Sequence, residues 1–506
     1  MNSVDTAALP SAKGSATAGR SHLLEESILP VLNSQRTIGT LGFVWIWIGL
    51  AVIIATFQLG AAGVQSLPLW QVVAVILLAN VCLALLMTLT ADIGTEHGLS
   101  FAVYLRAPFG TAGTHLPAIF RGIVAAIWFG IQTYLGALAI NGIVEYLTGF
   151  SNWALWYAIF AIVQIWNTAC GIKAVERLAD IAAPAIIAIS IWMYYTLDVM
   201  AQTQGLNIWN WVGGKEATVL TLFLANMAFW STLAIDIPNI TRFLKVDENT
   251  RSFAKRNRRV FLAQLVALPI TQTWVAVIGA AAFIAAGNWD PITVIQGSAT
   301  GLSLIVLLVM VVLAQWSTNN AANLIPAALT FVNAGAPWIG YRSAVVLAGI
   351  IGTLSMPWLI LDNLFSFLFS YGSFLSAIGG IMVADYFVIR RRRLNVPELY
   401  EAHGQFRFIG GINPAGVLAW LVAGGAAFYS GSWAFVVGLV LGFSLYLLLM
   451  WVWVLPRYKQ AEITSGYSDR YLATTMGHNW TYTAESGFRR LPTSQLGHDF
   501  DRREDL

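Results

Sequence analysis

Charge is scarce in this sequence. Of its 506 residues, only 10% are Asp, Glu, Lys or Arg, whereas soluble proteins carry roughly 25%. Hydrophobic residues make up 57%, so a soluble chain of this length, which would divide into about three domains, lacks the polar side chains to cover them. The composition excludes an ordinary soluble enzyme and a disordered chain, and it predicts a protein embedded in a lipid bilayer.

Residues that build metal centres and covalent frameworks are also scarce. The two cysteines, Cys82 and Cys170, both lie in apolar runs, which argues against a disulfide framework or a cysteine metal site. None of the six histidines lies in the middle of an apolar run, and HExxH, GxSxG and P-loop motifs are absent. We therefore expect neither an enzyme nor a bound cofactor, and a net charge of +3 does not indicate nucleic-acid binding.

Long apolar segments dominate residues 38–455. Each is near or above the roughly 20 residues that a spanning helix needs. We predict an all-α polytopic membrane protein with a transporter domain over 38–455 and polar tails over 1–37 and 456–506. The twelve predicted spans are 41–63, 69–91, 116–145, 152–171, 178–200, 218–240, 260–286, 301–332, 339–359, 364–389, 412–430 and 433–455.

The loop cations set the expected orientation, because cytoplasmic loops carry an excess of Lys and Arg. The outer loops between the predicted spans hold only Lys215. We therefore expect a multi-pass protein of the cytoplasmic membrane with both termini in the cytoplasm. The inner loops hold Arg106, Lys173, Arg177, Arg242, Lys245, Arg251, Lys255, Arg256, Arg258, Arg259, Arg342, Arg390, Arg391, Arg392, Arg393 and Arg407.

The third span carries a tryptophan ring beside a side-chain amide. Trp128 and Gln132 are four residues apart, so they lie about 40° from each other on a helix. An amide both donates and accepts hydrogen bonds, and this pair suits a flat, neutral heterocycle. The alternative is a packed tryptophan with an interhelical hydrogen bond from Gln132.

The eighth span is the most polar. Ala314, Ser317 and Thr318 fall on one helix face, and Asn319 and Asn323 form a second pair about 40° apart. Hydroxyl oxygens together with free backbone carbonyls suit a small hard cation, whereas amides suit an uncharged polar substrate. Helix–helix hydrogen bonding is the structural alternative.

Free carbonyls require an interrupted helix, which is tolerated at membrane depth only where it lines a cavity. Gly49 in the first span is a weak signal of such a break. The sixth span holds Trp230 in its middle and Asp236 near its inner end, and we expect Asp236 to form a structural pair with Arg242. The run Arg390–Arg393 is expected to anchor the tenth span at the inner surface.

Two long motifs resemble nucleobase–cation–symport family 1, especially its hydantoin, allantoin and uracil permease branch. They are WFGIQTYLGALA at Trp128–Ala139 and WSTNNAANL at Trp316–Leu324. The resemblance runs from residue 37 to about 455. Supporting matches are Arg106–Gly110, Asn288–Pro291 and Met382–Phe387.

The resemblance implies a fold of two five-helix inverted repeats plus two peripheral helices, with discontinuous first and sixth spans. It implies that Trp128 and Trp230 stack on either side of a planar ring and that Gln132 and Asn323 bind its amide edge, with Asn319 nearby. It also implies a transported sodium ion, held by the carbonyls of Gly49, Val52 and Ala314 and the hydroxyls of Ser317 and Thr318.

Two positions depart from the hydantoin-transporting pattern. Ile53 stands where that pattern has a substrate-contacting Gln, and Phe229 stands where it has Gly. The expected substrate is therefore a heterocycle with a smaller or less polar edge, with uracil as one candidate.

A cation-coupled importer, expected to be monomeric, is the function that these features favour. Sodium is preferred to protons because the hydroxyl pair is present and no His or Glu lies in the site. The alternatives are a proton-coupled cytosine or purine permease and an amino-acid carrier of the same fold. A channel is disfavoured because the polar groups lie on several distinct helix faces.

Overall fold

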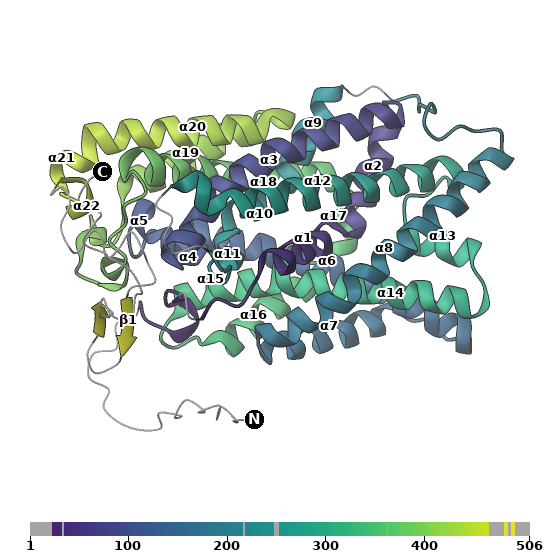
Figure 1. The fold of residues 1–506 in the computed structure, drawn as a ribbon, viewed down its shortest axis with the longest axis horizontal. Helices are drawn as coiled ribbons and strands as arrows, with labels where there is room; N and C mark the ends of the chain where they lie inside the picture. Colours follow the sequence, from purple (N-terminus) through teal and green to yellow (C-terminus); the bar gives the residue numbers. More distant parts are fainter. Residues whose placement is uncertain are drawn as a thin grey trace.

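The computed structural model describes residues 23–32, 35–215, 218–246, 252–361, 363–464, 480–483 and 487–490. Large parts of the two predicted tails lie outside these residues. The described chain is almost entirely helical (Figure 1), which confirms the predicted fold class. Its strands are β1 (Trp480–Thr483) and β2 (Gly487–Arg490), an antiparallel pair in the C-terminal tail.

The helices follow the predicted apolar segments closely. The longer α-helices are α1 (Thr40–Ala51), α2 (Ile54–Val64), α3 (Leu69–His97), α6 (His115–Thr148), α7 (Trp153–Ala169), α8 (Ile172–Thr203), α9 (Val219–Phe229), α12 (Phe253–Ala286), α13 (Pro291–Ser298), α14 (Gly301–Asn319), α15 (Ile325–Gly335), α16 (Tyr341–Thr353), α18 (Leu364–Val383), α19 (Pro414–Phe428) and α20 (Ala434–Leu449). The short ones are α4 (Phe101–Tyr104), α5 (Arg106–Phe109), α10 (Ser231–Asp236), α11 (Pro238–Thr241), α17 (Pro357–Leu361), α21 (Leu455–Arg457) and α22 (Ala461–Thr464).

Several segments depart from regular α-helix. Three π-helical segments continue α14, α18 and α20 in the same direction, namely η3 (Asn320–Leu324), η4 (Ala384–Ile389) and η8 (Met450–Val454). Short 3₁₀ turns are η1 (Glu26–Ile28), η5 (Pro397–Tyr400), η6 (Gln405–Arg407) and η7 (Gly431–Trp433). The π segment η3 widens the helix within the polar motif of the eighth span, which re-aims Asn323 relative to a straight helix.

Six helices in the described residues are long and apolar enough to cross a bilayer, and a bent pair would make a seventh. The bent pair is α1 and α2, which meet at an angle of 60°. The helices α9, α16 and α19 are apolar but shorter. The count of twelve spans therefore stays a prediction.

Two of the predicted apolar spans are interrupted by non-helical residues. The first breaks between α1 and α2, where Val52 and Ile53 are non-helical, with Ile53 fully extended at φ −122° and ψ 145°. The second breaks at Trp230, whose φ of −93° and ψ of 3° separate α9 from α10. Gly49 lies one turn before the first break, so the weak sequence signal at that residue marked a real interruption.

The helices form two packed groups, which we name for later use. The first helix group comprises α1, α2, α3, α9, α10 and α12, with α12 against α1, α2 and α3. The second helix group comprises α6, α7, α14, α15 and α16, with α6 packed against the other four. The helices α18, α19 and α20 pack together along one side of the molecule (Figure 1).

The loops with the predicted inner cations gather at one end of the molecule. In Figure 1, α4, α5, α11, α21 and α22 lie at the left, and α13 lies at the right. Backbone and side-chain bonds join these loops; Arg106, for example, donates to the carbonyls of Leu23 at 3.1 Å and Leu399 at 3.0 Å. The side chains of Lys173 and Arg177, and all of Arg251, fall outside the description.

Two arginines of the run after α18 point into the protein, so the run does not only face the membrane surface as predicted. Arg390 is fully buried, donates to Asp385 at 2.8 Å and pairs with Glu462 of α22. Arg392 donates to Asp92 at 2.8 Å. Burial raises the pKa of the Glu462 carboxyl, and the paired Arg390 guanidinium opposes that rise. Arg390 and Arg392 thus pair with buried carboxylates, because an unpaired buried charge is costly.

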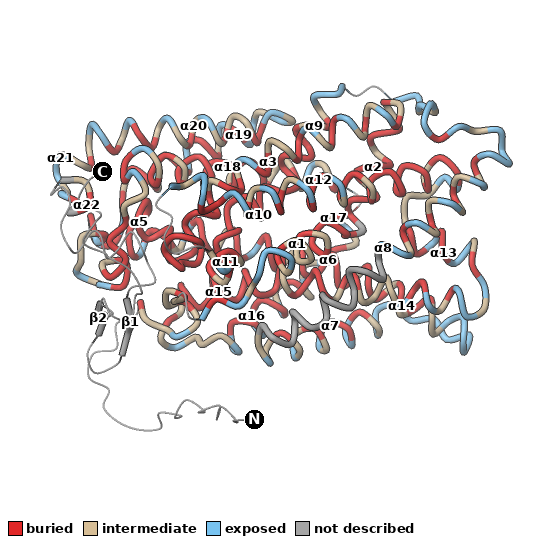
Figure 2. The backbone as a smooth tube through the Cα atoms, viewed as in Figure 1, coloured by how far each residue is buried: buried red, intermediate tan, exposed pale blue. Residues whose placement is uncertain are grey.

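Burial follows the contacts between the helices. Buried residues concentrate where the helix groups meet, and exposed positions lie on the outward faces (Figure 2). Many exposed side chains are large and apolar, as with Trp166 at 68% and Val452 at 71% exposure. An exposed apolar surface of this extent matches a protein whose solvent is lipid.

Contact between α2 and α12 depends on glycine. A methyl group at Gly60 would overlap the Ala276 carbonyl oxygen, and one at Gly279 would overlap the Phe57 carbonyl oxygen. The two backbones therefore touch, as is common where membrane helices pack. The close contact fixes the outer half of the first span to α12.

We predict that Gly60→Ala lowers the stability of the purified protein by about 1–3 kcal/mol, because added atoms in a close-packed contact force backbone shifts. The apparent Tm in detergent measures this. Gly425→Ala is the matched control, since its methyl would meet nothing within 4 Å. An unchanged Tm for Gly60→Ala would contradict the close contact between α2 and α12.

Candidate functional site

A cavity of about 350 Å³ lies between the two helix breaks. Both helix groups contribute to its wall. Eleven residues line it, namely Leu50, Ile53, Trp128, Gln132, Phe229, Trp230, Thr232, Leu233, Thr318, Ala322 and Asn323. The structure therefore brings together all but one of the predicted substrate residues, which come from four distant parts of the chain.

Three aromatic rings form one part of the cavity wall. The ring centroids of Trp128 and Phe229 are 5.6 Å apart, and those of Phe229 and Trp230 are 5.4 Å apart, both near-perpendicular. Phe229 thus contacts both tryptophans that the sequence predicts on either side of a planar ring. Because it replaces a smaller residue of the hydantoin-transporting pattern, Phe229 narrows the space beside the tryptophans.

Gln132 is the polar group most clearly aimed at the cavity. Its side chain is 3% exposed, and its Oε1 has no hydrogen-bond partner within the described part of the chain. A buried acceptor without a partner costs about 1–3 kcal/mol. A ligand that donates a hydrogen bond to Gln132 would recover that cost.

Asn319, the remaining predicted substrate residue, does not line the cavity. Its Nδ2 lies 3.0 Å from the Phe129 carbonyl oxygen, 3.1 Å from Thr133 Oγ1 and 3.0 Å from Gln164 Oε1. These contacts join α14 to α6 and α7 within the second helix group. The structural alternative noted for this polar cluster therefore applies to Asn319.

The contacts of Asn319 fix which atom Asn323 presents. A backbone carbonyl only accepts, so the Asn319 atom facing the Phe129 carbonyl must be nitrogen. Asn319 Oδ1 then accepts from Asn323 Nδ2 at 2.9 Å. Asn323 keeps its carbonyl oxygen and its second amide N–H for a ligand, so both amides at the cavity can offer an acceptor.

A second chain of buried amides holds Trp230. The indole Nε1 donates to Gln272 Oε1 at 2.7 Å, Gln272 Nε2 donates to Asn226 Oδ1 at 2.9 Å, and Asn226 Nδ2 donates to Asn80 Oδ1 at 2.9 Å. These residues belong to α12, α9 and α3 of the first helix group. An indole N–H only donates, so Trp230 fixes which atom donates and which accepts in each hydrogen bond of this series. The bond to Gln272 holds the Trp230 ring at the break.

Two of the predicted cation ligands are in contact at the first break. Thr318 Oγ1 donates to the Gly49 carbonyl oxygen at 2.7 Å, across the boundary between the helix groups. Ser317 is buried one residue earlier on the same helix. Val52 and Ala314 also lie at this boundary, where their side chains line a neighbouring pocket. The break frees carbonyl groups at a point where hydroxyl oxygens lie within reach.

Asp236 pairs with Arg121, and not with Arg242 as the sequence spacing suggested. Arg121 Nη2 lies 2.6 Å from Asp236 Oδ2, and both side chains are 1% exposed. Arg242 instead donates to the Ser27 carbonyl at 3.1 Å. Asp236 does form an ion pair, as predicted, but the predicted partner was wrong. The partner is Arg121 because α6 of the other helix group packs against α10.

Sequence reasoning missed several of these residues. Gln272 and Gln164 lie inside apolar spans, and the cost of a polar side chain in a membrane helix was a signal that could have marked them. Leu50, Leu233 and Ala322 carry no such signal, because apolar cavity residues look like ordinary span residues. Thr232 was visible as a polar residue of the sixth span but had no assigned role.

Two broken helices that meet at a cavity between two helix groups define a secondary transporter architecture. A family model described as permease for cytosine/purines, uracil, thiamine, allantoin matches residues 30–452. The chain belongs to this family, nucleobase–cation–symport family 1, and is a multi-pass membrane transporter.

Relatives and a solved structure agree with this assignment. A hydantoin permease of Microbacterium maritypicum is 30% identical over 452 residues, which cover 87% of this chain and 92% of that protein. An allantoin permease of Bacillus subtilis is 26% identical over 77% of this chain and 84% of its own length. The structure of Mhp1, a nucleobase-cation-symport-1 family transporter in a closed conformation with bromovinylhydantoin bound, superposes with a TM-score of 0.82 at 28% identity, covering 90% of this chain and 100% of Mhp1.

We predict that Gln272→Leu loosens Trp230 and weakens substrate binding. The substitution leaves the Trp230 N–H and Asn226 Oδ1 without partners, at about 1–3 kcal/mol for each buried group. Equilibrium binding and Tm of the purified protein measure the two effects. Gln264→Leu on the same helix is the control, because Gln264 contacts Thr88 and is not among the cavity-lining residues. Equal substrate affinity in both variants would contradict the assigned role.

Proposed function

We propose that this transporter imports a small, neutral, planar heterocycle, such as uracil, hydantoin, allantoin or a related nucleobase, by sodium symport. The family and the relatives' names support the substrate class. The observation that carries the proposal is the convergence of an aromatic wall, two amide acceptors and a hydroxyl-lined helix break at one cavity. We propose a monomer in the cytoplasmic membrane with both termini in the cytoplasm.

The ring would lie against Trp128, Phe229 and Trp230, with a polar edge toward Gln132 and Asn323. Because both amides can offer oxygen, N–H groups on this edge can donate to them. Imides and ureides such as uracil and hydantoin have them. Ile53, Leu50 and Leu233 would face the less polar part of the ring. Asn319 acts on this arrangement indirectly, by orienting Asn323.

Sodium would occupy the first break. The hydroxyls of Ser317 and Thr318 would supply two oxygens, and the carbonyls of Gly49, Val52 and Ala314 would supply the others. Hard cations prefer such oxygen ligands. The bond from Thr318 to Gly49 shows that atoms from both helix groups reach this point, so one ion would contact both groups.

Alternating access follows from the two helix groups. Each group has its own amide network, and the pairs Thr318–Gly49 and Arg121–Asp236 cross between the groups. Opening toward the cytoplasm would separate these pairs as one group moves against the other. Sodium and substrate favour the same closed state, so each raises the affinity for the other.

Proton coupling is the second candidate, because Asp236 is a buried carboxylate at the boundary between the helix groups. In that case protonation would weaken its pair with Arg121. An amino-acid carrier is disfavoured, because no Lys or Arg lines the described cavity to meet a carboxylate.

We predict that uptake by cells or proteoliposomes requires both an external sodium gradient and substrate N–H groups. Uracil, hydantoin and allantoin are tested as competitors of labelled uptake, with 1,3-dimethyluracil as the matched analogue without N–H. Each assay is repeated in choline at the same pH. Undiminished uptake in choline would reject sodium coupling, and equal competition by dimethyluracil would reject the amide orientation.

We predict that Thr318→Val weakens the apparent sodium affinity by about tenfold or more, since even outer-shell changes at cation sites cost about 10–100-fold. The sodium concentration for half-maximal uptake measures this. Thr330→Val is the control, because the Thr330 hydroxyl bonds only within its own helix, to the Pro326 carbonyl at 3.0 Å. A sodium dependence unchanged in Thr318→Val would contradict the site.

We predict that Phe229→Ala widens the substrate range toward rings with bulky substituents. Removing the ring clears space beside both tryptophans, so 5-benzylhydantoin should gain affinity relative to uracil. Competition of labelled uptake measures the ratio. Phe223→Ala on the same helix is the control, since Phe223 is not among the cavity-lining residues. An unchanged ratio in Phe229→Ala would show that Phe229 does not limit substrate size.

A further inference from the structure

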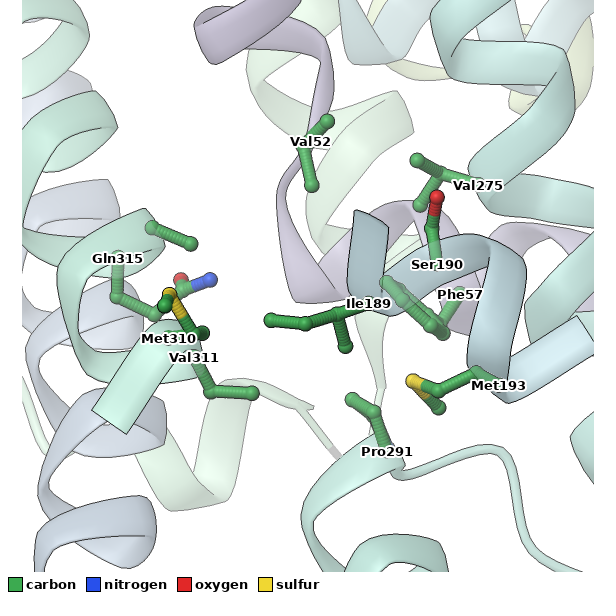
Figure 3. A pocket seen from close by; sticks show the side chains of 11 residues that line it. Val52, Phe57, Ile189, Ser190, Met193, Val275, Pro291, Met310, Val311 and Gln315 are labelled. Atoms are coloured by element: carbon green, nitrogen blue, oxygen red, sulfur yellow. The ribbon is translucent and has the colours of Figure 1, made fainter. Parts of the chain in front are cut away.

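A second pocket, which we call the side pocket, adjoins the first helix break (Figure 3). It has about 450 Å³ of space, part of it open to the surroundings, and is lined by five helices and the break. Its residues are Val52, Phe57, Ile189, Ser190, Met193, Val275, Pro291, Met310, Val311, Ala314 and Gln315. None of them lines the substrate cavity.

The side pocket and the substrate cavity lie on opposite sides of one thin wall. At the extended break, Val52 faces the side pocket and Ile53 faces the substrate cavity. On the eighth span, Ala314 and Gln315 line the side pocket, and Thr318 lies one turn further along at the substrate cavity. This wall carries the Thr318–Gly49 bond.

Part of the side-pocket lining is not fully buried. Ile189 of α8 and Met310 and Val311 of α14 are only partly buried, whereas the residues deeper in the pocket are buried. Val306, one turn before Met310 on α14, is apolar and 43% exposed. A molecule dissolved in the bilayer would approach the pocket from this partly buried side.

One polar side chain is free inside this apolar space. Gln315 is 1% exposed, and its Oε1 has no hydrogen-bond partner among the described residues. Figure 3 shows its amide extending from α14 into the pocket, toward Ile189. The other polar lining group, Ser190, is satisfied: it accepts from Trp274 Nε1 at 2.8 Å and donates to the Ile187 carbonyl at 2.7 Å.

We propose that the side pocket binds an uncharged, mainly apolar molecule that carries one N–H or O–H donor and enters from the bilayer. The apolar lining selects the body of the molecule, and Gln315 Oε1 accepts its donor. The occupant contacts α8, α12, α13 and α14 together with the break. The bound molecule therefore stabilises the closed state of the transporter. It slows transport without occupying the substrate cavity.

Binding is tested directly, so its failure does not depend on the proposed substrate or cation. Purified protein in lipid nanodiscs is heated with 4-tert-butylphenol or with 4-tert-butylanisole, which has the same body but no donor. A bound ligand raises Tm. We expect the phenol to bind about fivefold more tightly, the worth of one net hydrogen bond. Equal Tm shifts for the two probes would overturn the role of Gln315.

Substitutions in the lining test whether the probe binds in the side pocket. Gln315→Leu should remove the preference for the phenol, and Ile189→Phe or Val311→Phe should fill the pocket and abolish both Tm shifts. Ile191→Phe, on the lipid-facing side of the same helix, is the matched control and should keep the shifts. Shifts that persist in both filled variants would place the binding elsewhere and overturn the proposal.

The effect on transport distinguishes this pocket from the substrate cavity. The phenol should lower the maximal uptake rate and leave the KM for the heterocycle unchanged, and Ile189→Phe should be resistant. Competition between the phenol and the substrate would overturn the proposal, because it would mean that the probe enters the substrate cavity.

Discussion

The hydrogen bond between Thr318 and Gly49 is the contact on which the rest of this structure depends. Backbone polar groups cannot be left without partners in hydrocarbon, so a helix can break at membrane depth only where something meets its freed carbonyls. Here the meeting group is a hydroxyl from the opposite helix group, 2.7 Å away. The break therefore requires the hydroxyl of the polar eighth span. That hydroxyl can reach the break only because the two helix groups meet there.

Two buried amide networks make each helix group a unit. The chain from Trp230 to Asn80 stays within α9, α12 and α3, and the contacts of Asn319 stay within α14, α6 and α7. The hydrogen bonds within each network hold its members together, because each member would lose a partner if it moved alone. The substrate cavity lies between two rigid bodies whose facing surfaces it shares, which is the arrangement that alternating access requires.

Much of this was predictable from the sequence, and the reasons for the rest are physical. Apolar length set the helix ends to within about two helical turns. Polar side chains in the spans marked Trp128, Gln132 and Asn323, which do meet at one cavity. Periodicity treats each helix alone, so it could not show that Asp236 would face Arg121 rather than Arg242. It also assumes a regular helix, whereas the π segment η3 and the contacts of Asn319 decide that Asn323, and not Asn319, reaches the cavity.

The central claim is that a cation at the first break and a heterocycle in the cavity stabilise the same closed state. The most direct measurement is the Kd of the purified protein for uracil or hydantoin by calorimetry, in sodium and in choline at equal ionic strength and pH. The account predicts tighter binding in sodium, with the sodium affinity raised by the same factor when the heterocycle is bound. Equal Kd values in the two salts would contradict it.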